Sequence, residues 1–321
     1  MHMSKARDII QEIAEVRERR RIGNAMAELP LRLFALERAF KLHGSTDAEL
    51  AKYFPVALIA CLEGYFRMAI KDLVDAGEPY LSNAEKPASS VKLDFSLLRA
   101  VHGKSVTVGE IVSHGVPISR LEHIESVFSS LLGTGFLSNL RVVSDRWAHE
   151  VKGQPAEPIL KDPDRVFGDV ARTFELRHII CHEIASAYEI NLAEIESCFE
   201  SCVAFLRAAD ELISETLYPN APLTQSDMNT SAGESLIKKR AEVEYAIDEL
   251  QKSLGEKEID SLNKSQQLWE EYCDAWAHFV AGEREDGGTI WPVIYAGTAE
   301  ANAQNRLDEI KSYRRLSDGW K

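Results

Sequence analysis

The chain has 321 residues, 45% of them hydrophobic and 27% charged, which is normal for a globular protein and long enough for two domains. Its net charge of −14 argues against a protein that coats nucleic acid by bulk attraction, because such binding needs clustered Lys and Arg. A small basic pocket for one phosphate is still compatible with that charge. The dense basic run at residues 17–21 is most often a solvated helix face.

Apolar runs and cysteines indicate a cytoplasmic protein. The longest apolar runs, such as residues 54–62, are shorter than a bilayer span, and the charged start predicts no signal peptide, so we expect no membrane partner. The five cysteines are scattered and form no Cys-x-x-Cys pair. This pattern favours neither a zinc ribbon nor a disulfide framework, and we expect no cofactor and no metal.

The N-terminal third has helical periodicity. Apolar residues at three- and four-residue spacing predict a helix over residues 6–21, and Pro30 is expected to separate this N-terminal arm (residues 1–28) from the next helix. Residues 48–75 form a strongly apolar stretch that predicts a long helix, with Pro55 near its start.

Residues 80–163 are less regular. A loop rich in Pro, Ser and Asn is expected at 82–90 and a short helix at 119–132, and any strand should be confined to this region. Asp162 followed by Pro163 then marks the start of another helix, and a further helix is predicted over residues 192–217.

The clearest linker is YPNAPLTQSDMNTSAG, residues 218–233, because it lacks apolar periodicity. Beyond it, helical patterns cover residues 236–254, 259–281 and 290–316, with a break at Gly287-Gly288. We therefore expect an all-α protein. A helical bundle with an irregular insertion should occupy residues 29–217, and a small helical domain residues 234–321.

The segment that indicates chemistry is FELRHIICHEIA, residues 174–185. His178 and His182 lie four residues apart and so share nearly one helical face, at about 100° per residue. Arg177 precedes both and can reach the same pocket. Arg177 and His182 are separated by four residues, and a polar residue directly follows the arginine.

This Arg-x4-His pattern resembles the motif of the HEPN superfamily. CLEGYFR, residues 61–67, is similar to the partner helix of many HEPN proteins and carries Glu63 and Arg67 at Glu-x-x-x-Lys/Arg spacing. The segment DPDRVFGDVARTFELRHIICHE, residues 162–183, resembles the RiboL-PSP-type HEPN subgroup. The resemblance covers about residues 29–217.

The resemblance implies metal-independent cleavage of RNA by a homodimer in which each chain supplies half of the pocket. Histidine can move protons near neutral pH, and a guanidinium stabilises charge on a phosphate. His182 is then the general acid or base, Arg177 binds the scissile phosphate and His178 is an auxiliary polar group. Glu63 and Arg67 are supporting residues.

Simpler interpretations exist for each of these residues. His178 and His182 could be surface histidines on an ordinary helix. Their spacing also suits zinc, but Ser186 stands where a metalloprotease motif needs its second histidine. Glu63 and Arg67 could be a structural helical ion pair. Cys181 is better explained as a packed residue than as a nucleophile.

The C-terminal stretch, residues 265–306, resembles the small helical module of the LprI-type lysozyme inhibitors. The matching positions include Gln266, Trp269, Tyr272, Asp274, Gly287-Gly288, Tyr295, Arg306 and the apolar Ile310. Ala277 and Thr298 stand where that family carries two cysteines, so that disulfide cannot form. We expect the fold to be reused to recognise a partner or trigger; the alternative is a helical hairpin that packs on the first domain.

Together these patterns predict a cytoplasmic endoribonuclease, acting on RNA as a toxin or phage-defence effector. An antitoxin or trigger protein would bind the C-terminal module. One alternative is a non-catalytic HEPN module that binds nucleotides or partners. Another is a regulatory subunit whose C-terminal module recognises a peptide or a cell-wall fragment.

Overall fold

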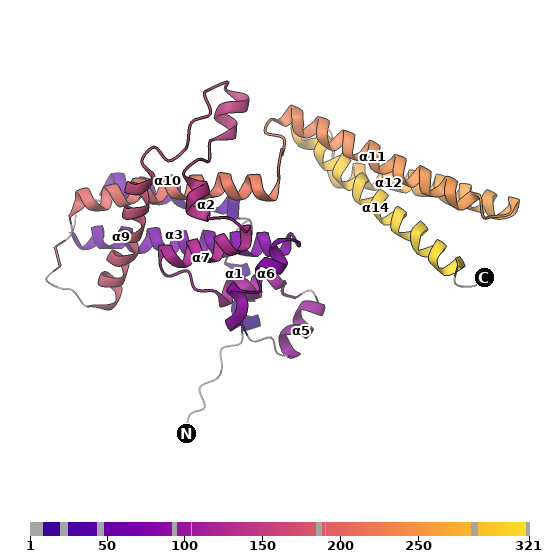
Figure 1. The fold of residues 1–321 in the computed structure, drawn as a ribbon. Coiled ribbons are helices and arrows are strands. Elements are labelled where there is room, and N and C mark those ends of the chain that lie inside the picture. Colours follow the sequence, from indigo (N-terminus) through magenta and orange to yellow (C-terminus); the bar gives the residue numbers. More distant parts are fainter. Residues whose placement is uncertain are drawn as a thin grey trace. The chain divides into compact units, whose positions relative to one another are not determined.

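The computed structural model describes residues 9–19, 25–43, 48–91, 95–103, 105–183, 188–189, 191–283 and 288–318. The chain divides into two compact units, Met1–Pro219 and Asn220–Lys321. The structure is 81% helical with no strand among the described residues, which confirms the all-α class (Figure 1). The one pairing of β type is an isolated bridge between Ser144 and Pro158 within that described part.

The first unit is built from ten α-helices and two short helical turns within its described residues. In chain order they are α1 (Ile9–Glu18), α2 (Ala25–His43), α3 (Ala48–Asp75), α4 (Tyr80–Asn83), η1 (Pro87–Ser90), α5 (Phe95–His102), α6 (Val108–Gly115), α7 (Leu121–Leu132), α8 (Phe136–Leu140), η2 (Trp147–Val151), α9 (Pro163–His182) and α10 (Leu192–Leu217).

Helix α3 forms the centre of this unit and packs against α2, α6, α9 and α10. By length and apolar content alone, Glu49–Asp75 could span a bilayer. The sequence did not predict this, because its uninterrupted apolar runs are all shorter than a bilayer span. Two thirds of its most apolar window is buried inside the unit, as in the core helix of a globular protein. Pro55 lies inside this helix rather than at its first turn.

An aromatic cluster joins α3 to α7, α8 and α10. The ring of Phe66 lies 5.1 Å from that of Phe128, 6.0 Å from Phe136 and 5.8 Å from Phe205 between centroids. All four rings are fully buried. Such edge-on and tilted contacts add to the free energy gained from burying the rings.

The region expected to be irregular consists mainly of short helices. Helix α6 begins with a capping box, in which Thr107 accepts from the Glu110 amide and Glu110 accepts from the Thr107 amide. Helix α7 corresponds to the helix expected at 119–132 and is followed by Gly133 in the left-handed conformation, φ 71°. The turn η1 lies within the loop expected at 82–90.

The N-terminal helix belongs to the first unit rather than forming a separate arm. Ile13 is buried in a cluster with Leu97 and Ile111, and Arg17 forms a bidentate ion pair with the nearly buried Glu110. The expected break at Pro30 was wrong, because α2 begins at Ala25 and continues through the proline. The last two residues of the basic run at 17–21 lie outside the described residues.

The second unit consists of α11 (Gln225–Gln251), α12 (Glu256–Ala281), the turn η3 (Gly288–Ile290) and α14 (Trp291–Asp318). Figure 1 shows three long helices side by side, and α14 packs against both others. Small side chains at this interface permit close approach of the helices; they are Ala277, Ala281, Ala296, Ala299 and Ala303.

The linker predicted at residues 218–233 is longer than the connection that the structure shows. The side chain of Thr224 caps α11 by accepting from the Asp227 amide, so the helix begins at Gln225, inside the predicted linker. Residues 218–224 connect α10 to α11. The polar composition of 225–233 hid the helix, because most of these residues face solvent.

We expect Phe66→Ala to destabilise the first unit by about 3–5 kcal/mol, because it leaves a large cavity among buried rings. Phe34→Ala is the matched control, since that ring is 69% exposed, and should change the free energy of unfolding by less than about 0.5 kcal/mol. Urea unfolding followed by circular dichroism measures both. Equal effects of the two substitutions would contradict the proposed core.

We expect the contribution of Asp210 to the free energy of unfolding to depend on pH. Burial raises the pKa of its carboxyl to about 6, and the nearby Tyr65 hydroxyl opposes part of the rise. The folded protein holds this proton to higher pH than the unfolded chain, so the contribution of Asp210 to stability falls as pH rises from about 4 to above 6. Asp210→Asn should therefore raise the free energy of unfolding at neutral pH and change it little near pH 4. A stabilisation of the same size at both pH values would count against a raised pKa.

Candidate functional site

Helix α9 carries the expected catalytic residues, and its start is well defined. Asp162 caps it by accepting from the Arg165 amide at 3.2 Å, and Pro163 occupies the first turn, where its missing N–H costs nothing. Its buried side chains include Val170 and Phe174, and the helix packs against α3 and α10. The remaining face at its C-terminal end is open to solvent.

Polar contacts fix α9 to α10. The Asp169 carboxylate accepts from the hydroxyls of Ser197 at 2.8 Å and Ser201 at 2.6 Å. Arg172 donates to Glu194 at 2.7 Å and to the Tyr188 hydroxyl at 3.0 Å. Hydrogen bonds with Glu194 and then Glu175 raise the pKa of Arg172. These contacts hold the start of α10, and Tyr188 in the segment before it, against α9. They do so at a point one turn or more before Arg177.

The structure brings Arg177 and His182 together at the C-terminal end of α9. Nη1 of Arg177 lies 3.2 Å from Nε2 of His182. A guanidinium only donates, so Nε2 accepts in this arrangement and a neutral His182 carries its proton on Nδ1. Arg177 is half-buried, whereas His182 is exposed.

His178 joins the same surface. Its ring centroid lies 5.2 Å from that of His182, and its Nε2 lies 3.9 Å from a Glu183 carboxylate oxygen. The His178 side chain is 66% exposed. Cys181 is exposed as well, which differs from the packed role expected for it.

Glu63 and Arg67 lie at a different place. The Arg67 guanidinium donates to the carbonyls of Ser113 and, at 3.4 Å, His114, which are at the end of α6. Burial lowers the pKa of Arg67, and the charge of Glu63 opposes this effect. Within the described residues no hydrogen bond or ion pair connects Glu63 or Arg67 to the α9 site. Arg67 therefore caps a helix, which is a structural contact.

A metal centre finds no support in the described part of the chain, where no group of three His, Cys, Asp or Glu side chains is arranged to hold an ion. His178 and His182 lack a third ligand of these types there. The geometry that exists is a guanidinium beside an imidazole, and this pair can bind an anion and exchange a proton.

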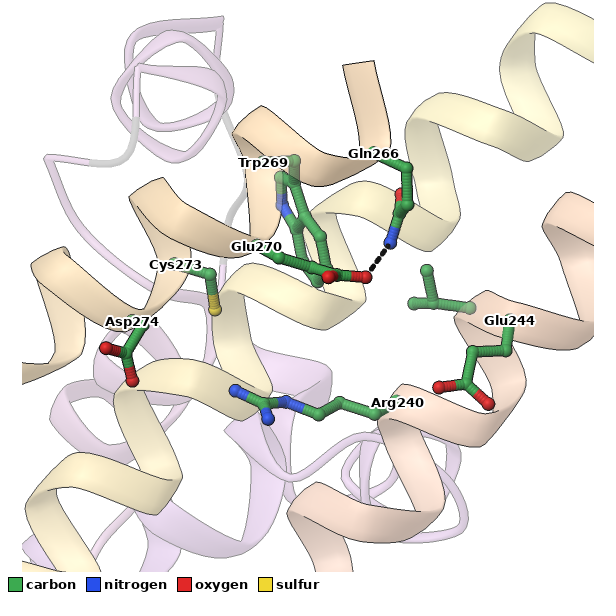
Figure 2. Close-up of a pocket in the computed structure, with 8 residues that line it drawn as sticks. Arg240, Glu244, Gln266, Trp269, Glu270, Cys273 and Asp274 are labelled. Atoms are coloured by element: carbon green, nitrogen blue, oxygen red, sulfur yellow. Dashed lines mark hydrogen bonds between the residues drawn. The ribbon is translucent and has the colours of Figure 1, made fainter. Parts of the chain in front are cut away.

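The second unit contains a groove between α11 and α12 with a volume of about 350 Å³ (Figure 2). Helix α11 contributes Arg240 and Glu244 to its wall, and α12 contributes Trp269 and Glu270. Cys273 lies deeper and is buried. Burial raises the pKa of this thiol, and the nearby Arg240 guanidinium opposes part of the rise.

Positions that resemble the LprI pattern meet in and around this groove. Gln266, Trp269 and Asp274 line it directly. The Tyr295 hydroxyl donates to Asp274 at 2.5 Å, and Nε of Arg306 donates to Gln266 at 3.3 Å. These two hydrogen bonds between LprI-like positions therefore connect α12 to α14. Ala277, at a position of the missing disulfide, is fully buried, and all five cysteines of the chain are free.

A comparison with known protein families supports the LprI resemblance of the second unit. The model of the family described as Lysozyme inhibitor LprI matches residues 219–310, nearly the extent of the second unit. The second unit thus contains an LprI-like domain, and the match extends the likeness expected for 265–306. No HEPN family model matches the chain. No curated protein and no solved structure matches it either.

Sequence reasoning missed two features. It did not find the contacts of Arg172, because Glu194 lies 22 residues further on, on another helix, and no spacing rule pairs them. It also missed Arg240 and Glu244 on α11. Their spacing of four on one helix, opposite the LprI-like positions of α12, was the available signal.

Proposed function

We propose that the first unit is a metal-independent endoribonuclease of HEPN type, with Arg177 and His182 as its catalytic pair. The observation that carries the proposal is the 3.2 Å contact between Nη1 of Arg177 and Nε2 of His182 on an exposed helix end. The resemblance of residues 162–183 to RiboL-PSP-type HEPN proteins supplies the reaction class.

The geometry suggests how binding and proton transfer are coupled. In the free protein the Arg177 guanidinium occupies the lone pair of His182 Nε2. A phosphate is a stronger, bidentate partner for a guanidinium than a neutral imidazole is. RNA binding would thus draw Arg177 to the scissile phosphate and free Nε2 to accept the ribose 2′-hydroxyl proton, the base step of the reaction. The exposed His178 would then contact the substrate as an auxiliary group.

The exposure of His178 and His182 supports the proposal of a homodimer. A catalytic charge network works best where water is excluded, and the single chain leaves His178 and His182 open to solvent. A second copy packed on the end of α9 would bring two such pairs into one enclosed pocket. Glu63 and Arg67 would act only indirectly, because the contacts of Arg67 are with α6.

The LprI-like domain is proposed to recognise a partner, such as an antitoxin or trigger protein, in a cytoplasmic toxin or phage-defence effector. Free cysteines throughout the chain are compatible with a reducing compartment. The rival proposal is a non-catalytic module or regulatory subunit. It is favoured by the family match, which covers the second unit and leaves the ribonuclease residues outside it.

We expect His182→Ala to lower RNA cleavage by about 10²–10⁴-fold, because alanine cannot transfer a proton. Arg177→Ala should lose a similar amount through lost stabilisation of phosphate charge, and His178→Ala should lose less. His102→Ala is the control, an exposed histidine at the end of α5. Gel analysis of total RNA in EDTA measures these rates.

The products should carry a 2′,3′-cyclic phosphate and a free 5′-hydroxyl. Full activity of the His182 variant, or a requirement for a divalent ion, would refute the mechanism. If the unmodified protein cleaves no RNA, the binding-module proposal replaces it.

We also expect a homodimer whose interface includes the end of α9. Cys181→Glu places a charge in that interface and should yield a monomer with little cleavage. Val142→Glu is the control, since Val142 is 71% exposed elsewhere in the first unit, and should remain dimeric and active. Sedimentation at micromolar concentration decides the matter. A monomeric unmodified protein that still cleaves RNA would rule the shared pocket out.

A further inference from the structure

The groove between α11 and α12 has the dimensions and lining of a site for a small ligand. Its volume of about 350 Å³ is within the range of small-molecule sites. Val243 provides a buried apolar part of its lining and Trp269 a broad aromatic part. Figure 2 shows Arg240, Glu244, Trp269 and Glu270 around a common space. No feature of the proposed ribonuclease uses it.

The charges in the groove are unbalanced. The Asp274 carboxylate already has two partners: it accepts from the Tyr295 hydroxyl at 2.5 Å and lies 3.5 Å from His278 Nδ1. The Arg240 guanidinium extends toward Cys273 and Asp274 (Figure 2). Its charge lowers the pKa values of Cys273 and Tyr295, in opposition to the effect of burial.

Glu244 and Glu270 come from different helices. In the described part of the chain neither forms an ion pair, and Glu270 accepts a hydrogen bond only from the Gln266 amide, at 3.2 Å (Figure 2). The groove lining carries three carboxylates, those of Glu244, Glu270 and Asp274, against the single guanidinium of Arg240, and this net negative charge favours the entry of a cation.

The cation should be organic. The described residues hold no cluster suited to a metal ion, whereas an indole attracts alkylammonium and guanidinium groups through its face. The apolar surface of Val243 and Trp269 suits a methylene chain. We propose that this groove binds an alkylammonium or guanidinium group, with its charge near Glu244 and Glu270 and its carbon chain against Trp269.

The ligand chemistry has two possible sources, a free polyamine or a basic side chain of a peptide. Isothermal titration of the full chain would use four probes: spermidine, agmatine, acetyl-Gly-Lys-Gly-amide and acetyl-Gly-Arg-Gly-amide. Butane-1,4-diol is the uncharged comparison. We expect saturable binding of at least one cationic probe and none of the diol. Binding of the peptides alone would assign a side chain, and binding of the amines alone would assign a free polyamine.

A matched pair of substitutions locates the site. Glu270→Gln should weaken binding on the order of 10-fold, since it removes the charge and keeps an acceptor for Gln266. Glu271→Gln is the control, because Glu271 accepts from Gln267 at the same 3.2 Å, one residue further along α12 and outside the groove. Glu244→Gln should behave as Glu270→Gln does, which tests the contribution of α11.

Three results would overturn the proposal. One is the absence of saturable binding by all four probes at millimolar concentration. A second is equal weakening by Glu271→Gln and Glu270→Gln, which would indicate diffuse attraction to an acidic surface. The third is binding of acetate or phosphate in competition with the cations, which would assign the groove to Arg240 and an anion. RNA cleavage does not enter any of these outcomes.

Discussion

Helix α3 removes its apolar side chains from water by packing against α2, α6, α9 and α10, and the main core of the first unit, including the position of α9, depends on that burial. The Phe66 ring extends the contact to α7 and α8. Once one side of α9 is committed to this core, its C-terminal residues must face solvent. The exposure of His182 and the partial exposure of Arg177 thus result from packing as much as from chemistry.

Helical periodicity was sufficient for the fold class, because each long helix buries a continuous stripe and so repeats its apolar residues in sequence. The same signal failed where burial is slight. Helix α11 begins at Gln225 inside a polar segment, and its start depends on a cap from Thr224. Pro30 misled for the opposite reason, because tertiary packing of α2 tolerates a proline that removes one hydrogen bond.

The candidate site was only partly accessible from sequence. Arg177 and His182 are close in the chain, so local geometry brings them together, and their proximity follows from one helix. Arg67 has the spacing of a supporting residue, yet its contacts are decided by α6, which is more than 40 residues away. Contacts between helices, such as those around Arg172 or across the groove of the second unit, depend on register and crossing angle. No spacing within one helix encodes either.

The distribution of thiols gives the chain a built-in chemical handle. Cys61, Cys198, Cys202 and Cys273 are buried, whereas Cys181 is exposed and directly precedes His182. A maleimide fluorophore added to the folded monomer should therefore attach at one position, beside the Arg177–His182 pair, with no cysteine engineered. Its emission would report on the surroundings of that helix end, so assembly, nucleotide binding and the arrival of a regulator could each be followed in real time.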